Sequence, residues 1–320
     1  MSEFLQLDFA ALLSAALAGG TCGLLGSFLL LRRESMLGDA LAHSVLPGIV
    51  AAYALTGLRS AWPMLLGALA AGLLAAAAIT WVRRAARMEP GAATGLVFTG
   101  FCAVGLVLLE VTGIRALHFH VEAVLFGQLE TLVWLEAEGV ASLLDPAALA
   151  ALPAQIGLLA GVALGAGLFV TLCWRPLKLI AFDPDYGRSL GMRPGGWELA
   201  LNAAIGAAAV AAFQAVGTIL VVALLICPAV ALRLLTDRYA AQLLGGAALG
   251  AGLGVLGVLL AGPLPAWLGQ EMSFNAAGVI GSLGGLAVAC AAWWRARRIS
   301  AAAASGGVAP PAAAPPSRPR

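Results

Sequence analysis

The sequence predicts an all-α integral membrane protein, a bundle of about eight or nine transmembrane helices that includes one short hairpin of broken helices. Of its 320 residues, 61% are hydrophobic and only 11% are charged, against roughly 25% charged in soluble globular domains. The mean hydropathy is +0.96, and apolar runs near the roughly 20 residues that cross a bilayer recur from end to end. We therefore expect one transmembrane domain over residues 1–299 and a disordered Ala/Pro-rich tail over residues 300–320.

Clusters of basic residues predict how the chain threads the membrane. They occur in alternate loops, as the positive-inside rule requires of cytoplasmic loops. The first nine residues contain no basic residue and so lack the charged start of a cleavable signal peptide. The prediction is a multi-pass protein of the cell (inner) membrane with its N-terminus outside and its C-terminus in the cytoplasm. The expected membrane segments are 10–31, 37–56, 61–82, 91–112, 155–174, a 199–232 block, 239–261 and 274–294.

The 199–232 block is one long apolar run whose two flanks are both basic. If both flanks face the cytoplasm, the block must cross the membrane an even number of times, which predicts a hairpin. A split near Gln214 leaves two short arms. These are either two short spans or broken helices shielded inside the bundle, the arrangement that transporters use around binding sites.

Many of the 40 glycines lie four residues apart inside the predicted spans. This small-xxx-small spacing lets two helices approach closely. The groups concerned are Gly19/Gly23, Gly161/Gly165, Gly246/Gly250/Gly254 and Gly281/Gly285.

Asp39 and His43 form an ionisable pair in the second predicted span. Their i, i+4 spacing puts both on one helical face with Cβ atoms about 6 Å apart, where a carboxylate and an imidazole could share one cation. An acid at the centre of a membrane helix costs about 2.5 to 3.5 kcal/mol, so such residues usually face an interior path. The spacing alone leaves open a plain hydrogen bond between helices, or a hydrated Asp39 near the cytoplasmic end.

One carboxylate and one imidazole do not complete a metal site, because zinc takes about four ligands and manganese more. A twofold dimer would supply two aspartates and two histidines around one axis. Such a set suits zinc, manganese or ferrous iron. A straight helix would place His43 only about 10 Å from the cytoplasmic edge, which is shallow for a midplane site.

Glu110, His118 and His120 are weaker candidates for contact with a metal. Glu110 ends the fourth predicted span, where it either lies near the entrance of a path or is a hydrated interfacial carboxylate. The outer loop over residues 113–154 carries both histidines among acidic residues, a face that could attract cations, dock a basic partner or simply be solvated. Trp134 suggests that part of this loop lies at the membrane interface.

The cytoplasmic loop over residues 175–198 is predicted to contain a short exposed helix. Asp183 can cap this helix, with Pro184 at its first position. Such a helix can insert into a groove of a cytoplasmic partner, and a capped surface turn is the alternative.

The chain offers no nucleotide site. Lys178 is its only lysine, and no G-x-x-x-x-G-K-[ST] motif surrounds it. We therefore expect no enzymatic activity and no permanently bound cofactor, so any ATP hydrolysis must come from another polypeptide. The net charge of +2 is too small to suggest a nucleic-acid partner.

With these features in place, the sequence resembles the membrane subunits of the metal-cation ABC importers, the zinc and manganese uptake permeases. The resemblance extends over nearly the whole chain to about Trp294. Its most specific stretches are LRRESMLGDALAHSVLPG from Leu31 to Gly48 and GTILVVALLICPAVA from Gly217 to Ala231. The supporting stretches are 89–100, 124–127 and 182–191.

The resemblance implies an importer-type ABC permease whose Asp39 and His43 bind the transported divalent metal ion. It implies a homodimer in membrane lipid that works with cytoplasmic ATPase subunits and an extracytoplasmic metal-binding protein. The segment that would couple to the ATPase contains Asp183, Pro184, Tyr186, Arg188, Leu190 and Gly191.

Two departures and two alternatives accompany this expectation. The 134–153 stretch is longer than expected, and Cys227 replaces a usual aliphatic residue, as either a soft ligand or a structural thiol. An ATP-driven permease for a metal chelate or corrinoid would want a wide, uncharged cavity. A secondary transporter driven by an ion gradient would use Asp39 and His43 as a proton relay.

Overall fold

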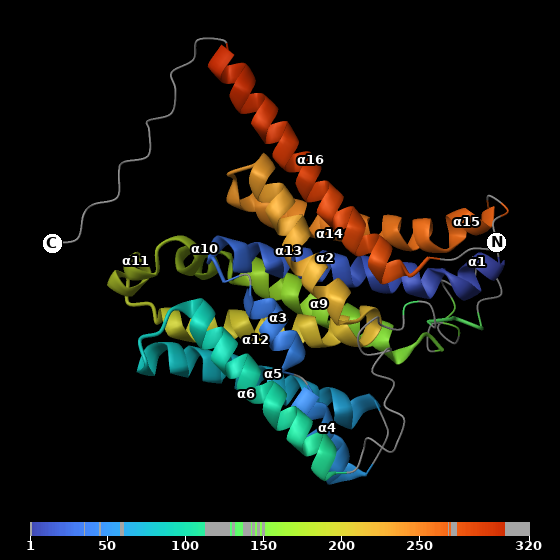
Figure 1. The fold of residues 1–320 in the computed structure, drawn as a ribbon, viewed down its shortest axis with the longest axis horizontal. Coiled ribbons are helices and arrows are strands. Elements are labelled where there is room, and N and C mark those ends of the chain that lie inside the picture. Colours follow the sequence, from blue (N-terminus) through green and yellow to red (C-terminus); the bar gives the residue numbers. More distant parts are fainter. Residues whose placement is uncertain are drawn as a thin grey trace.

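The computed structural model is a bundle of α-helices (Figure 1). It describes residues 2–34, 36–44, 46–57, 61–112, 151–267, 269 and 274–304, with residues 129, 132–136, 142, 145 and 148 between them. The helices are α1 (Ser2–Leu7), α2 (Phe9–Leu31), α3 (Met36–His43), α4 (Leu46–Thr56), α5 (Ala61–Ala85), α6 (Pro90–Val111), α9 (Ala154–Leu172), α10 (Trp174–Phe182), α11 (Pro184–Ser189), α12 (Pro194–Val216), α13 (Thr218–Leu235), α14 (Tyr239–Ala261), α15 (Pro263–Trp267) and α16 (Ala276–Ala304).

The described helices confirm the predicted all-α membrane bundle. Seven of them, α2, α5, α6, α9, α12, α14 and α16, are long and apolar enough to cross a membrane. Two further apolar helices, α4 and α13, are shorter. The total of eight or nine spans stays a prediction.

The second predicted span is divided into two helices. α3 ends at His43 and α4 begins at Leu46. Pro47, the second residue of α4, has no N–H to donate and disfavours helical geometry at the residue before it. At the break the Ala40 carbonyl accepts hydrogen bonds from the Ser44 backbone N–H at 3.0 Å and from the Ser44 hydroxyl at 2.6 Å, and both bonds close the last turn of α3.

The 199–232 block is likewise two helices, α12 and α13, and Gly217 separates them. Its φ of +83° is a backbone conformation that glycine adopts without a steric penalty. The division predicted near Gln214 is therefore found three residues further on. α12 is longer than the predicted arm because it begins at Pro194, a favoured residue for the first helical position.

α2 lies at the centre of the bundle and packs against α9, α12, α13 and α14. In Figure 1, α4, α5 and α6 form one group beside α12, and α13, α14 and α16 form a second group on the other side of α2. α3 contacts α5, α6 and α12 as well as α13. The short helix that carries Asp39 and His43 therefore touches both groups.

Glycines set the crossing of α2 and α14. A Cβ atom on Gly19 or Gly23 would overlap the carbonyl of Gly250 or Gly246 on the other helix, so the two backbones are in direct contact. This confirms two of the predicted glycine groups. In the other two groups, on α9 and α16, an added Cβ atom would meet nothing within 4 Å, so these glycines make no such contact within the described chain.

We expect the substitution Gly250→Ala to lower the stability of the bundle by about 1 to 3 kcal/mol, because the new methyl group forces α2 and α14 apart. The melting temperature of the detergent-solubilised protein measures this loss. Gly252→Ala is the matched control, since it lies on the same helix and meets nothing within 4 Å. Equal melting temperatures for the two variants would contradict this account of the crossing.

Candidate functional site

α3 is the element that carries the predicted site. Asp39 and His43 lie one turn apart on it, so helix geometry puts them on the same face. The structure describes the side chain of His43, whereas the side chain of Asp39 lies outside the described part. In Figure 1, α3 lies among the other helices and at neither end of the bundle.

Small side chains allow α3 to lie deep between its neighbours. A Cβ atom on Gly38 would approach Leu225 Cδ1 of α13 to 2.7 Å and Leu29 Cδ1 of α2 to 3.2 Å. The residue next to Asp39 is therefore pressed against two helices. On α6, the Phe98 ring meets the half-buried His43 ring edge to face, with 5.6 Å between the ring centroids.

His43 lies in the last turn of α3, at the point where the helix stops. The last carbonyls of a helix lack intrahelical partners and carry the negative end of its dipole, which favours a cation. Transporters use interrupted helices in this way, with the carbonyl ends of half-helices facing bound cations. The imidazole and the helix end thus both suit a positive ion.

Of the weaker candidates, the structure describes only Glu110, and it does not bring Glu110 to this place. Glu110 is an exposed residue near the end of α6, 12 residues after Phe98 and hence about 18 Å from it along the helix. His118 and His120 lie outside the described residues. Among the side chains that are described, no three or more His, Cys, Asp or Glu are grouped closely enough to hold a metal ion.

The structure describes the surroundings of Cys227, one of the two departures, and of Trp134, the first residue of the long 134–153 stretch. Cys227 of α13 faces α16, where a Cβ atom on Gly284 would lie 3.3 Å from its sulfur. Trp134 is fully buried. Its indole N–H donates to the Ala148 carbonyl at 2.8 Å, and its backbone N–H donates to the Gln6 carbonyl at 2.7 Å. The ring therefore packs inside the protein and does not anchor the outer loop at the membrane interface.

The predicted short helix of the 175–198 loop is present as α11. Asp183 Oδ1 accepts a hydrogen bond from the Tyr186 backbone N–H at 2.9 Å, and Pro184 is the first helical residue. Gly191, with φ of +79°, ends the turn that follows. Tyr186 and Leu190 leave 55% and 58% of their surfaces exposed, so α11 and the residue after it expose large, partly apolar side chains.

α10, which precedes α11, was not predicted as a helix of its own. Leu177 and Ile180 on one of its faces are buried, whereas Arg175 and Lys178 are more exposed. Its Trp174 ring lies 4.8 Å from the ring centroid of Tyr239 in α14. The three-residue spacing of Leu177 and Ile180 is the signal that could have revealed this amphipathic helix. α10 fixes α11 to the bundle.

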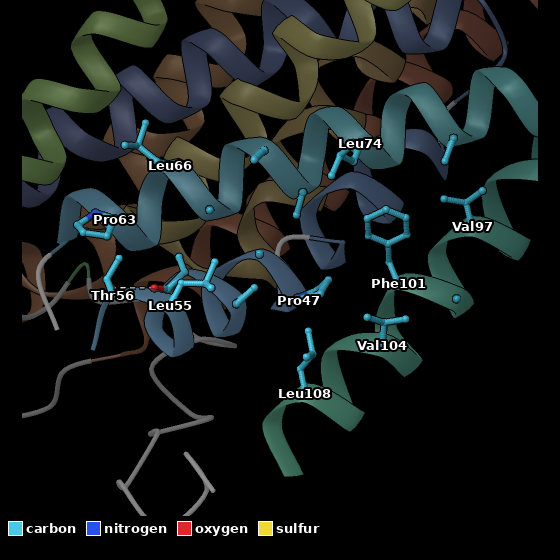
Figure 2. Close-up of a pocket in the computed structure, with 18 of the residues that line it drawn as sticks. Pro47, Leu55, Thr56, Pro63, Leu66, Leu74, Val97, Phe101, Val104 and Leu108 are labelled. Carbon is cyan, nitrogen blue, oxygen red and sulfur yellow. Dashed lines mark hydrogen bonds between the residues drawn. The ribbon is translucent and has the colours of Figure 1, made fainter. Parts of the chain in front are cut away.

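An open groove of about 1150 Å³ lies between α4, α5 and α6 (Figure 2). It begins at Pro47, directly after the break, and none of the described side chains that line it is charged. Its one hydroxyl, on Thr56, donates to the Ala52 carbonyl at 2.7 Å. The groove is therefore a surface for apolar groups and offers no ligand to an ion. The labelled lining residues are Pro47, Leu55, Thr56, Pro63, Leu66, Leu74, Val97, Phe101, Val104 and Leu108.

The sequence of this chain matches a known family of membrane proteins over most of its length. The sequence profile of the ABC 3 transport family matches residues 2–267. The chain belongs to the ABC 3 transport family. It is a multi-pass membrane permease, as the resemblance implied.

Individual members of the family are similar over most of their lengths. The manganese transport system membrane protein MntD of Bacillus subtilis is 33% identical over 278 residues, which are 87% of this chain and 88% of MntD. The zinc transport system membrane protein TroC of Treponema pallidum is 34% identical over 76% of each chain. The solved structure of PsaBC from Streptococcus pneumoniae in complex with Fab matches this ABC 3 permease with a TM-score of 0.66 and 26% identity, over 88% of this chain and 90% of the other.

Proposed function

We propose that this ABC 3 permease is the membrane-spanning subunit of an ATP-driven importer that carries manganese, zinc or ferrous iron into the cytoplasm. The observation that carries the proposal is the end of α3. Asp39 and His43 share one face of a short helix that stops inside the bundle. Two residue types that bind metals thus occur at a helix end that favours cations. Two similar proteins of the same family are named for manganese and zinc transport.

A second copy of the chain would complete the site. One carboxylate and one imidazole are too few for a transition metal, and a twofold axis next to α3 doubles both. The apolar groove of α4, α5 and α6 supports this arrangement, because it lies beside α3 and can receive apolar helices of a partner. Each chain of the homodimer then supplies half of the ligands.

The energy for transport would come from partner subunits. We propose that a cytoplasmic ATPase docks on α11 through Tyr186, Arg188 and Leu190, and that an extracytoplasmic protein delivers the ion. When the ATPase closes on ATP, it would push α11, rotate the helix groups and change the side to which Asp39 and His43 are open. The N-terminus would then face outside.

Neither alternative accounts for the site equally well. A permease for a metal chelate or corrinoid has no use for Asp39 and His43, and the described lining of the wide apolar groove offers such a cargo only the Thr56 hydroxyl, which is already bonded to the Ala52 carbonyl. A secondary transporter needs no docking helix for an ATPase. Membership of the ABC 3 family also favours ATP-driven transport.

We expect His43→Ala to lower metal uptake by at least about 10- to 100-fold, because loss of a metal ligand weakens binding at least as much as loss of its outer-sphere partners. Uptake of radioactive manganese into liposomes that contain the full complex measures the effect, and competition with zinc ranks the two ions. Copurification with the ATPase should be unchanged. Normal uptake by the variant would refute the site, and an equal loss in Glu110→Gln would place Glu110 on the path as well.

The half-site arrangement predicts a dominant effect of one altered copy. In a tandem fusion of two permease copies, His43→Ala in a single copy should abolish most uptake, because the remaining ligands are again too few. The wild-type tandem is the control. Half-maximal uptake from the mixed tandem would show that each copy works alone.

Asp183→Ala should weaken docking of the ATPase. The variant loses the hydrogen bond to the Tyr186 N–H, and loss of such a cap costs about 1 kcal/mol of helix stability. We expect less ATPase to copurify and uptake to fall. Asp237→Asn is the control, because it removes only an exposed ion pair with Arg233, away from α11, which contributes little. Equal copurification of both variants would argue against α11 as the docking element.

A further inference from the structure

A buried cluster of charges lies at the turn between α2 and α3. Glu34 Oε2 is 2.9 Å from Arg32 Nη2, and Glu34 Oε1 is 2.6 Å from Arg83 Nη1 in the last turn of α5. Only 5% of the Arg32 side chain and 9% of the Glu34 side chain are exposed. Arg32 Nη1 also donates to Asn202 Oδ1 of α12 at 3.3 Å. One carboxylate therefore joins α2 to α5, and Arg32 extends the link to α12.

The backbone turn brings Glu34 back over Arg32. The Arg33 N–H donates to the Leu30 carbonyl at 3.1 Å, and the Glu34 N–H donates to the Leu29 carbonyl at 2.8 Å. These two bonds form a Schellman motif, which requires a left-handed residue and usually has glycine there. Arg33 occupies that position with φ of +58°. A non-glycine residue in this conformation persists only where the surroundings hold it, and the Glu34 ion pairs do so here.

The cluster lies between α11 and the proposed metal ligands. α3 begins two residues after Glu34 and carries Asp39 and His43. On the other side, α12 follows α11 and is bound to α5 a second time, because Arg84 Nη2 is 3.6 Å from Glu198 Oε2. The Arg84 guanidinium also lies directly on the backbone of Gly195. The end of α5 thus contacts both the start of α12 and the turn that leads into α3.

A small cavity separates Glu34 from α6. A cavity of about 10 Å³ is bordered by Glu34, Thr80, Thr94 and Asn202, which is enough space for a single water molecule. The four residues come from the α2–α3 turn, α5, α6 and α12. Buried polar groups with several fixed partners hold their elements in a single arrangement. A shift of α12 can therefore displace α3 without direct contact between α11 and the ligands.

We propose that Glu34 is a positioning residue for transport: with Arg32 and Arg83 it transmits movement of α11 and α12 to α3, and so to Asp39 and His43. This inference rests on the proposed function, in which α11 receives the ATPase. Glu34 touches neither the ion nor the nucleotide. Without the Glu34 carboxylate, ATP hydrolysis continues but no longer moves the metal site.

The test compares Glu34→Gln with the wild type in the full complex, reconstituted in liposomes with its ATPase and binding protein. We expect the amount of manganese imported per ATP hydrolysed to fall about fivefold or more, a usual size for coupling between sites, while ATP hydrolysis stays within about twofold. Glu34→Asp, which keeps the charge, should recover part of the ratio. Asp237→Asn, which removes the exposed ion pair with Arg233 at the end of α13, is the matched control and should keep the wild-type ratio.

A second measurement needs no cargo. Hydrogen–deuterium exchange of peptides over α3 and α11 is recorded with and without ATP and vanadate, which hold the ATPase closed. In the wild type both peptides should respond, and in Glu34→Gln only α11 should respond. If Glu34→Gln does not fold, Arg83→Gln is used instead, because its side chain is 36% exposed and its loss strands less buried charge.

The outcomes separate the two proposals. A wild-type complex that imports no metal refutes the proposed cargo, and the exchange experiment still decides the role of Glu34. An α3 response in the variant that equals the wild type overturns the inference. Uptake and hydrolysis that fall together, in proportion to a lower melting temperature, also overturn it, because they show a purely structural role.

Discussion

A helix that stops inside a membrane must be enclosed by protein, because its last carbonyls find no partner in lipid. This constraint governs the arrangement around α3. Both the backbone N–H and the hydroxyl of Ser44 donate to the Ala40 carbonyl, and the short helix is surrounded by α2, α5, α6, α12 and α13. The end of α3 is also where we propose that the transported ion binds, because the carbonyl end of an interrupted helix favours a cation.

The same enclosure explains why two of the basic residues pair with a buried carboxylate, although most basic residues lie at helix ends. Most basic residues lie at helix ends, where the positive-inside rule places them. Arg32 and Arg83 belong to that pattern, yet Glu34 converts them into a buried link between helices. Burial of a carboxylate is tolerated only when its partners are held in place. The residues that fix the topology therefore also fix the start of α3.

Much of the fold followed from the sequence where the signal was local. Apolar runs marked the spans, Asp183 and Pro184 marked α11, and the flanking charges showed that the 199–232 block divides, as it does at Gly217. The rest depended on partners distant in the chain. Trp134 suggested a membrane interface, but Gln6 and Ala148 hold it inside the protein.

For the site too, the sequence predicted the local features and missed the contacts between helices. The spacing of Asp39 and His43 was visible, and so was Pro47, but a proline does not reveal whether a membrane helix bends or stops. The contact between His43 and Phe98 joins two helices whose register no spacing rule supplies. Arg32 and Arg83 were interpreted only as topology signals, and this interpretation did not reveal their pairing with Glu34. α10 was missed because it continues the preceding apolar span almost without interruption.

The glycine crossing of α2 and α14 has a mechanical consequence. Where the two backbones are in contact, no side chain can change its rotamer to let one helix shift against the other. α2 and α14 therefore move as one rigid unit. A cycle of inward and outward opening must then bend the chain elsewhere. The helix breaks at Ser44 and Gly217 are the places where the chain can bend, and both lie outside α2 and α14. The protein thus combines one rigid pair of helices with two flexible connections, and α3 ends at one of these connections.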